Sequence, residues 1–281
     1  MYNLSKKWGT NVQKPTKRQS IRNVLQIVLI AFFCIITVLF DFLNITILSD
    51  GFRNKMLVKI MQQGSGAIAA ILLMIRLKIQ LFGKPKAWLY LIPCLIIAVD
   101  NFQFSAYFNE KMALVRNGTI DFILFGGYCL LVGLFEECIF RGVIFSVIAG
   151  LCSKDKKGFL YTYVISSVVF GAAHLLNGIS GAVILQVGYT CLTGGLFAFC
   201  LIKTQNILCA AVIHGIYNFC GLLFDEMGTG AVFDVGTAVT MLIVSVLVGI
   251  FVLWKVWTYS EEERTSLYQK LGVVKQKEVN K

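Results

Sequence analysis

The sequence LLVGLFEECIFRGVIFSV, at residues 130–147, places charged side chains in the middle of a run long enough to cross a bilayer. Both ends of this run are apolar, but Glu136, Glu137 and Arg141 lie near its centre. A charged side chain near the centre of a membrane helix costs about 2.5–3.5 kcal/mol on insertion scales. Three such groups therefore require either partners or a water-filled cavity.

Helical spacing indicates how these charges are arranged. Glu137 and Arg141 are four residues apart, so they share one face of a helix and can pair, which would hold the helix and tune the local field. Glu136 is turned by about 100° from Glu137 and cannot share that pair equally well. We therefore predict that the Glu136 carboxylate meets groups from other helices, which in a membrane indicates a functional site. The alternative is that all three charges are structural contacts between helices.

The composition indicates a membrane protein. The chain has 281 residues, of which 57% are hydrophobic and 15% charged, with a mean hydropathy of +0.74. Soluble domains are closer to half apolar and a quarter charged. We predict an all-α, polytopic helical bundle of about eight transmembrane helices, since each apolar segment supplies close to the required length of about 20 residues. These segments are 24–48, 56–75, 88–104, 120–147, 159–176, 181–202, 207–224 and 236–257.

The net charge of +11 is the expected charge of a membrane protein with basic loops, not of a nucleic-acid-binding protein. Most of the 26 Lys and Arg residues fall in short loops and tails on the side that holds both termini. The positive-inside rule then predicts cytoplasmic N- and C-termini for a multi-pass protein of the cell membrane. The partners that this pattern predicts are the lipid bilayer and a substrate at the membrane, with no nucleic acid; it indicates no particular oligomeric state.

The only two histidines of the chain fall in apolar segments. His174 follows Phe170 by four residues, and His214 precedes Asn218 by four, so His214 and Asn218 share one helix face. A single histidine in an apolar helix is more often a packing residue than a catalyst. Here both histidines lie at membrane depth on segments that follow the carboxylates, and we predict that they are catalytic.

A carboxylate, two imidazoles and an amide at membrane depth suit the hydrolysis of a peptide bond. Glu136 is predicted to act as the general base on a water molecule, which His174 would share or orient. His214 and Asn218 carry N–H groups that could stabilise the oxyanion of a tetrahedral intermediate.

A zinc-dependent variant would use the same residues, with Glu136, His174 and His214 as the ligands. The HExxH pattern of many zinc proteases is absent from the sequence. We therefore favour the metal-free mechanism, with Zn as the alternative and no other cofactor indicated.

Three motifs in order resemble a known family. EECIFR at 136–141 matches EExxxR, FGAAH at 170–174 matches FxxxH, and HGIYN at 214–218 matches HxxxN. Together they resemble the CAAX-processing and bacteriocin-processing (CPBP or Abi) family of intramembrane glutamic proteases, and the chain is similar to CAAX prenyl protease 2. The resemblance implies an endopeptidase with Glu136 as the water-activating residue, His174 as its partner, and an oxyanion site at His214 and Asn218.

Family members similar to the eukaryotic enzyme cut prenylated CAAX tails, and bacterial members are linked to peptide maturation, bacteriocin self-immunity and quorum-signal processing. The resemblance therefore predicts cleavage of a membrane-associated peptide or protein, in peptide maturation or bacteriocin self-immunity. The predicted organisation is a basic cytoplasmic arm (1–22), N-terminal transmembrane helices (23–119), a catalytic helical core (120–224), a last loop and transmembrane helix (225–257), and a charged, solvated cytoplasmic tail (258–281).

Three other functions remain as alternatives. A non-catalytic bacteriocin-immunity or scaffold protein could use the same bundle to bind a partner, and Glu136→Gln would distinguish it from an enzyme. A rhomboid-type serine protease would use Ser180 in the sequence GISG at 178–181, but serine beside glycine is common in turns. A transporter could use the carboxylates as proton relays, although the sequence lacks the paired inverted halves of many transporters.

Overall fold

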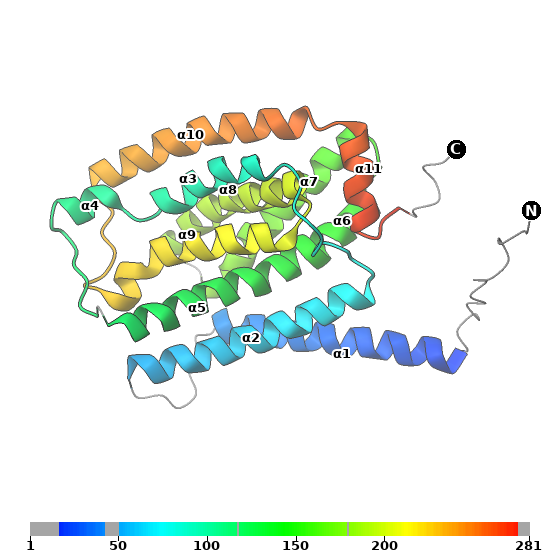
Figure 1. Ribbon diagram of the computed structural model, residues 1–281, viewed down its shortest axis with the longest axis horizontal. Helices are drawn as coiled ribbons and strands as arrows, with labels where there is room; N and C mark the ends of the chain where they lie inside the picture. Colours follow the sequence, from blue (N-terminus) through cyan, green and yellow to red (C-terminus); the bar gives the residue numbers. More distant parts are fainter. Residues whose placement is uncertain (1–16, 43–50, 117, 179, 275–281) are drawn as a thin grey trace, which may run out of the picture.

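The computed structural model describes residues 17–42, 51–116, 118–178 and 180–274, and every named element there is helical (Figure 1). The long helices are α1 (Lys17–Phe42), α2 (Phe52–Arg76), α5 (Thr119–Glu137), α7 (Lys156–Ala173), α8 (Gly181–Thr204), α9 (Ile207–Met227) and α10 (Val235–Trp257). The shorter elements are η1 (Trp88–Tyr90), α3 (Leu91–Asp100), α4 (Phe104–Phe108), η2 (Cys138–Ile144), α6 (Phe145–Leu151), η3 (His174–Asn177) and α11 (Glu261–Lys270). The predicted all-α bundle is confirmed.

Six helices in the described part of the chain are long and apolar enough to cross a membrane. They are Phe52–Arg76, Thr119–Leu151, Lys156–Asn177, Val183–Thr204, Ile207–Met227 and Val235–Trp257. The other two predicted segments overlap shorter apolar stretches. The first is Val24–Thr37, which is part of the 26-residue helix α1, and residues 43–48 of that predicted segment lie outside the described residues; the second is Trp88–Asp100. The structure thus shows six candidate membrane-spanning helices in the described residues, and the predicted number of about eight stays a prediction.

The second of these shorter stretches ends earlier than the predicted segment 88–104. α3 stops at Asp100, and Gln103 has a φ of 61°, in the left-handed region, before α4 begins at Phe104. From Trp88 to Asp100 a helix rises about 20 Å, which is less than the hydrocarbon thickness of about 30 Å. The left-handed residue turns the chain because a helix cannot continue through it.

The loops gather at two opposite ends of the bundle, which we name the α11 end and the α4 end after the short helices there (Figure 1). At the α11 end, the Gln80 N–H donates to Lys270 O at 2.7 Å, and the Ile207 N–H donates to Leu81 O at 2.8 Å. At the α4 end, the Val115 N–H donates to Met227 O at 3.0 Å. These bonds join segments far apart in the sequence, so each end is a fixed layer of loops.

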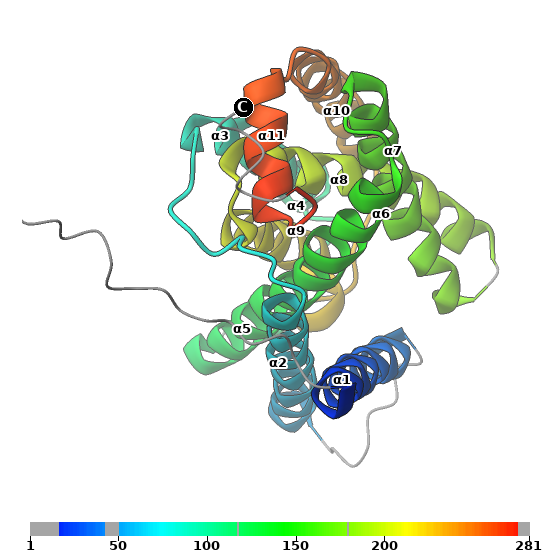
Figure 2. The ribbon, with the colours of Figure 1, turned by 90° about the vertical axis from the view of Figure 1, so that its right-hand side faces the viewer.

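The tail after α10 differs from the predicted solvated segment. α11 lies across the α11 end of the bundle, where Figure 2 shows it beside α6, and its Leu267 and Tyr268 are buried. Ser260 and Glu263 form a capping box at its start. Just before α11, the Tyr259 hydroxyl donates to Ile202 O at 2.8 Å. Residues 261–274 are therefore packed against the bundle, because α11 has two apolar side chains that gain by burial.

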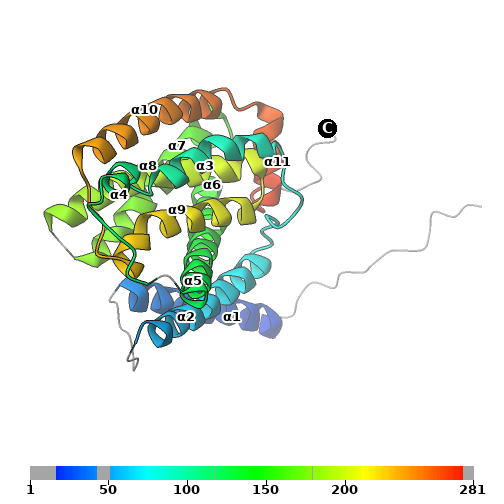
Figure 3. The ribbon, with the colours of Figure 1, turned by 60° about the vertical axis from the view of Figure 1, so that its left-hand side comes forward.

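α5 occupies the middle of the bundle and positions the charged residues of 136–141. It packs most extensively against α9 and also against α2. α1 and α2 lie on one side of α5, whereas α3 and α10 lie on the other (Figure 3). The centre of α5 and the π-helical turn η2 that follows it are thus enclosed by other helices.

Candidate active site

The predicted pair between Glu137 and Arg141 forms at the point where α5 changes its winding. α5 ends at Glu137 and continues without a break into η2, a π-helical turn from Cys138 to Ile144, and then into α6. The Arg141 Nε lies 3.2 Å from Glu137 Oε2, and both side chains are 0% exposed. π-turns are rare, and they occur often at functional sites.

Groups from two further helices surround Arg141. Its Nη2 donates to the Gly194 carbonyl of α8 at 2.8 Å. Its guanidinium lies 4.1 Å from the centre of the Phe170 ring on α7 and 5.6 Å from that of Phe197 on α8. A buried cation needs compensation, which a carboxylate, a carbonyl oxygen and aromatic faces here supply.

His214 lies between the two glutamates. Its Nδ1 is 3.0 Å from Glu137 Oε1, and its Nε2 is 3.8 Å from Glu136 Oε2. An ionised carboxylate only accepts hydrogen bonds, so we assign the Nδ1 proton to the bond with Glu137. His214 is buried, whereas the Glu136 side chain is 15% exposed. The arrangement directs Nε2 of His214 toward the less buried of the two carboxylates.

Two glycines allow α5 and α9 to approach closely enough for this contact. A Cβ on Gly133 would lie 2.5 Å from the Ala211 carbonyl oxygen and 2.8 Å from the Gly215 nitrogen. A Cβ on Gly215 would lie 2.8 Å from Leu130 Cδ2. Because Gly215 follows His214 directly, the crossing of the two helices sets the position of the imidazole against Glu137.

His174 begins η3, directly after α7. Its Nδ1 lies 3.1 Å from the Phe170 carbonyl oxygen, and the ring is half-buried. The Phe170 ring contacts both imidazoles edge-on, at 5.3 Å from that of His174 and 5.7 Å from that of His214. The structure therefore brings both histidines to the charged turn of α5.

The part of the chain that holds these residues matches a known family. Residues 118–220 match the family described as type II CAAX prenyl endopeptidase Rce1-like. The chain carries an Rce1-like domain. No curated protein and no solved structure was found to match the chain. The Rce1-like match contains all three motifs of the sequence analysis, and it gives this chain, with its six candidate membrane helices, a domain of a protease family.

Asn218 lies one turn beyond His214 on α9 of the Rce1-like domain and is half-buried. Among the described residues its amide makes no hydrogen bond. Its place on the same face as His214 is therefore found as predicted, whereas its function remains a prediction.

The donor set for zinc does not assemble in the Rce1-like domain. Among the described residues, no three His, Cys, Asp or Glu side chains are grouped so that they could hold a metal ion. The bond from His214 Nδ1 to Glu137 leaves Nε2 as the only ring nitrogen that could bind a metal. The proposed ligands Glu136, His174 and His214 are thus not grouped as a metal site in this arrangement, and the zinc alternative remains a prediction.

Ser180, the nucleophile of the serine-protease alternative, has a structural function in the turn before α8. Its Oγ accepts a hydrogen bond from the Val183 N–H at 3.2 Å, and the residue is the N-cap of the helix. The residue is exposed. These observations support the interpretation of GISG as a turn sequence.

Sequence reasoning missed Phe197 of α8, whose ring stacks on His214 with centroids 4.4 Å apart and an interplanar angle of 18°. It lies within an apolar run, in none of the three motifs. No pattern in the sequence distinguishes it from Phe199, the other buried phenylalanine of α8, so only the fold identifies it.

Proposed function

We propose that the chain is an intramembrane endopeptidase in which Glu136 activates the attacking water. The observation that carries the proposal is the placement of His214, with one ring nitrogen on Glu137 and the other facing Glu136. The Glu136–His214 separation of 3.8 Å exceeds a direct hydrogen bond, and it leaves the two groups close enough to contact the same water molecule. Both oxygens of the Glu137 carboxylate already contact charged or polar partners, Arg141 and His214. Glu136 is therefore the carboxylate that we assign to proton transfer.

The proposed reaction transfers one proton twice. Glu136 removes a proton from the water, the resulting hydroxide attacks the peptide carbonyl carbon, and the carbonyl oxygen becomes an oxyanion. The C–N bond then breaks, and Glu136 returns the proton to the leaving nitrogen. His174, on the same side of the bundle as the charged turn, would orient the water.

His214 and Asn218 would stabilise the oxyanion. For Nε2 of His214 to donate a hydrogen bond, the imidazole must carry protons on both nitrogens, because Nδ1 already donates to Glu137. The Glu137 carboxylate at 3.0 Å would stabilise that imidazolium. With His214 charged, the two carboxylates are balanced by Arg141 and His214, so that the buried group as a whole is neutral.

We propose that the substrate is a peptide or protein at the membrane, in peptide maturation or bacteriocin self-immunity. We also propose that the chain crosses the membrane eight times, with the α11 end and both termini in the cytoplasm. Lys154, Lys156 and Lys157 lie in the turn before α7 and its first residues, and Lys84 and Lys86 lie in the 77–87 loop, as the positive-inside rule expects for a cytoplasmic face. A reporter enzyme fused after residue 281 tests this orientation, and a signal outside the cytoplasm would contradict it.

The test of catalysis is Glu136→Gln, which keeps the size of the side chain and removes the base. Mass spectrometry would compare the peptides released by membranes carrying the wild type or the variant. We expect release to fall by at least about 100-fold, the low end of the contribution of a general base. Glu226→Gln is the matched control, because Glu226 also lies on a membrane helix but is bound to Lys55 and Lys59 at the α4 end.

The release pattern decides between catalysis and binding. If Glu136→Gln releases the same peptides as the wild type, the proposed function is wrong. If no peptide depends on the protein but protection against a bacteriocin survives Glu136→Gln, the non-catalytic immunity function is correct instead.

A further inference from the structure

Phe197 of α8 has the closest ring contact with the buried histidine. Its ring lies nearly parallel to the His214 imidazole, with 4.4 Å between centroids and 18° between planes. Phe170 and Tyr217 contact the Phe197 ring edge-on, at 6.1 Å and 5.9 Å. Phe197 is 1% exposed, so its own ring is held on several sides.

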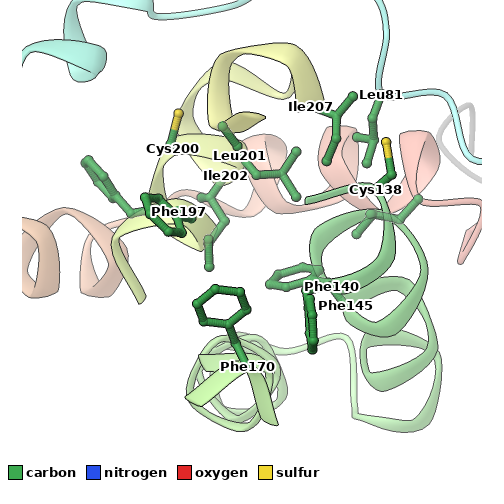
Figure 4. Packing of buried hydrophobic residues seen from close by; sticks show 14 of the residues in the cluster. Leu81, Cys138, Phe140, Phe145, Phe170, Phe197, Cys200, Leu201, Ile202 and Ile207 are labelled. Carbon is green, nitrogen blue, oxygen red and sulfur yellow. The ribbon is translucent and has the colours of Figure 1, made fainter. Parts of the chain in front are cut away.

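Phe197 also lies beside the group that compensates Arg141. The Gly194 carbonyl, which accepts from Arg141, is three residues before Phe197 on α8. Figure 4 shows Phe197, Phe170 and Phe140 converging from three different elements. The turn of α8 from Gly194 to Phe197 thus contacts Arg141 through a hydrogen bond and His214 through a ring contact. These two residues are both bound to Glu137.

The His214 imidazole gains from such a contact because its hydrogen bond to Glu137 acts on one ring nitrogen only. The imidazole can turn about its Cα–Cβ and Cβ–Cγ bonds, and this one bond to Glu137 is the only hydrogen bond that the ring makes among the described residues. Rotation would carry Nε2 away from Glu136, from which it is now 3.8 Å. A stacked aromatic ring opposes this rotation, and its negative face also attracts an imidazolium.

We propose that Phe197 is a positioning residue that holds the plane of the His214 imidazole so that Nε2 faces Glu136. The proposal rests on the proposed function for its consequence in catalysis. Its structural part, the fixed imidazole plane, stands on the ring geometry alone.

The chain offers a matched control two residues further along. Phe199 is 0% exposed on the same helix, but its ring contacts Tyr90 at 5.8 Å and Phe251 at 6.4 Å. Phe199→Leu therefore removes an equally buried ring from α8 without removing a contact to His214. The test variants are Phe197→Leu and, in case it fails to fold, the flexible and similarly sized Phe197→Met.

The first readout is NMR of the imidazoles in the full-length protein in detergent, purified with a tag that contains no histidine. The chain has only two histidines, so ring-labelled protein gives two sets of imidazole signals, and His174→Gln assigns them. In the wild type we expect the His214 ring protons to be shifted upfield by the stacked Phe197 ring. Phe197→Leu and Phe197→Met should remove this shift and leave the His174 signals unchanged, and Phe199→Leu should change neither set.

The second readout is the rate of peptide release from membranes, as for Glu136→Gln. We expect Phe197→Leu and Phe197→Met to lower this rate about 10- to 100-fold, because small displacements of catalytic groups have effects of that size. Phe199→Leu should stay within about threefold of the wild type.

The outcomes separate the two proposals. Unchanged His214 signals in both Phe197 variants overturn the positioning of the imidazole. Changed signals with a wild-type release rate show that the imidazole plane does not matter to catalysis, and they also overturn the inference. If Glu136→Gln retains release while the Phe197 variants lose the His214 shift, the proposed function fails and the placement of His214 by Phe197 stands.

Discussion

This chain contains a buried ion pair in the middle of the bundle and a solvent-accessible ion pair at the α4 end, and both join a basic residue to an acidic one. In the middle of the bundle, Arg141 and Glu137 approach to 3.2 Å with both side chains 0% exposed. At the α4 end, Lys111 and Asp234 approach to 2.7 Å; the Asp234 side chain is 9% exposed, but that of Lys111 is 47% exposed. The distances are similar, so the difference between the pairs lies in their access to water.

That difference determines how many partners each charge needs. Exposed pairs contribute roughly 0–1 kcal/mol, because water already solvates both charges. Burying a pair costs several kcal/mol for each ion, which is repaid only when further polar groups complete the site. Accordingly, Arg141 also binds the Gly194 carbonyl, and Glu137 also binds His214. Such a costly network in the middle of a membrane bundle is better explained by function than by stability.

The strongest test of this comparison is to remove one buried charge. Arg141→Met should destabilise the protein by about 3–5 kcal/mol, because it leaves Glu137 buried without its cation. The measurement is denaturant-induced unfolding of the purified protein in detergent. Lys111→Met at the α4 end should cost at most about 1 kcal/mol. Equal effects of the two substitutions would remove the distinction between the two pairs.

A double substitution sharpens the result. Arg141→Met combined with Glu137→Gln removes both charges, so stability should recover in large part relative to Arg141→Met alone. Peptide release should stay low in the double variant, since His214 then loses the carboxylate that orients it. Recovery of both stability and release would show that the buried pair has only a structural function.

The next largest effect concerns the close approach of helices that makes the buried network possible. Gly133→Ala places a methyl group 2.5 Å from the Ala211 carbonyl oxygen, so α5 and α9 must separate. We expect a loss of about 1–3 kcal/mol, together with reduced peptide release, because His214 moves from Glu137. Thermal unfolding and release assays measure the two effects.

Gly126 provides the control on the same helix. A Cβ there would lie 3.8 Å from Phe219, an ordinary contact, so Gly126→Ala should be neutral or slightly stabilising. If Gly126→Ala and Gly133→Ala have the same effect, helix propensity rather than the crossing controls the result.

The sequence predicted most of the fold because the bilayer imposes a length on each apolar run. The segment 207–224, for example, corresponds to α9 at Ile207–Met227. The early end of α3 was missed, since nothing in the sequence indicates that Gln103 adopts a left-handed conformation. The packed α11 could have been expected in part, because Ser260 and Glu263 have the spacing of a capping box.

The candidate site was predictable only within single helices. Four-residue spacing correctly paired Glu137 with Arg141. The bond between Glu137 and His214 joins residues 77 positions apart and depends on the crossing at Gly133, which helical periodicity does not encode. Phe197 was missed for the same reason, since its function arises from the register of α8 against α9.

The smallest predicted effect belongs to the solvent-accessible pair and depends on pH. Asp234 is the N-cap of α10, where it accepts hydrogen bonds from Lys111 Nζ at 2.7 Å and from the Thr237 N–H at 2.8 Å. These two donors hold the pKa of the Asp234 carboxyl below its ordinary value. The folded protein therefore keeps this carboxylate ionised at a pH where the unfolded chain has already taken up a proton.

The sign of the pH effect follows from that lowered pKa. The stabilisation is complete above the ordinary aspartate pKa of about 3.9 and is lost as the pH falls below it. Asp234→Asn should thus lower the melting temperature by a constant amount between pH 8 and pH 5. Below about pH 4 the difference from the wild type should shrink. Thermal unfolding in detergent across this range measures it, with Lys111→Met expected to reduce the same difference. If the melting-temperature difference stays constant down to pH 3, the Asp234 cap stabilises α10 through its hydrogen bonds and not through its charge. The charge of the Lys111–Asp234 pair would then contribute little to stability.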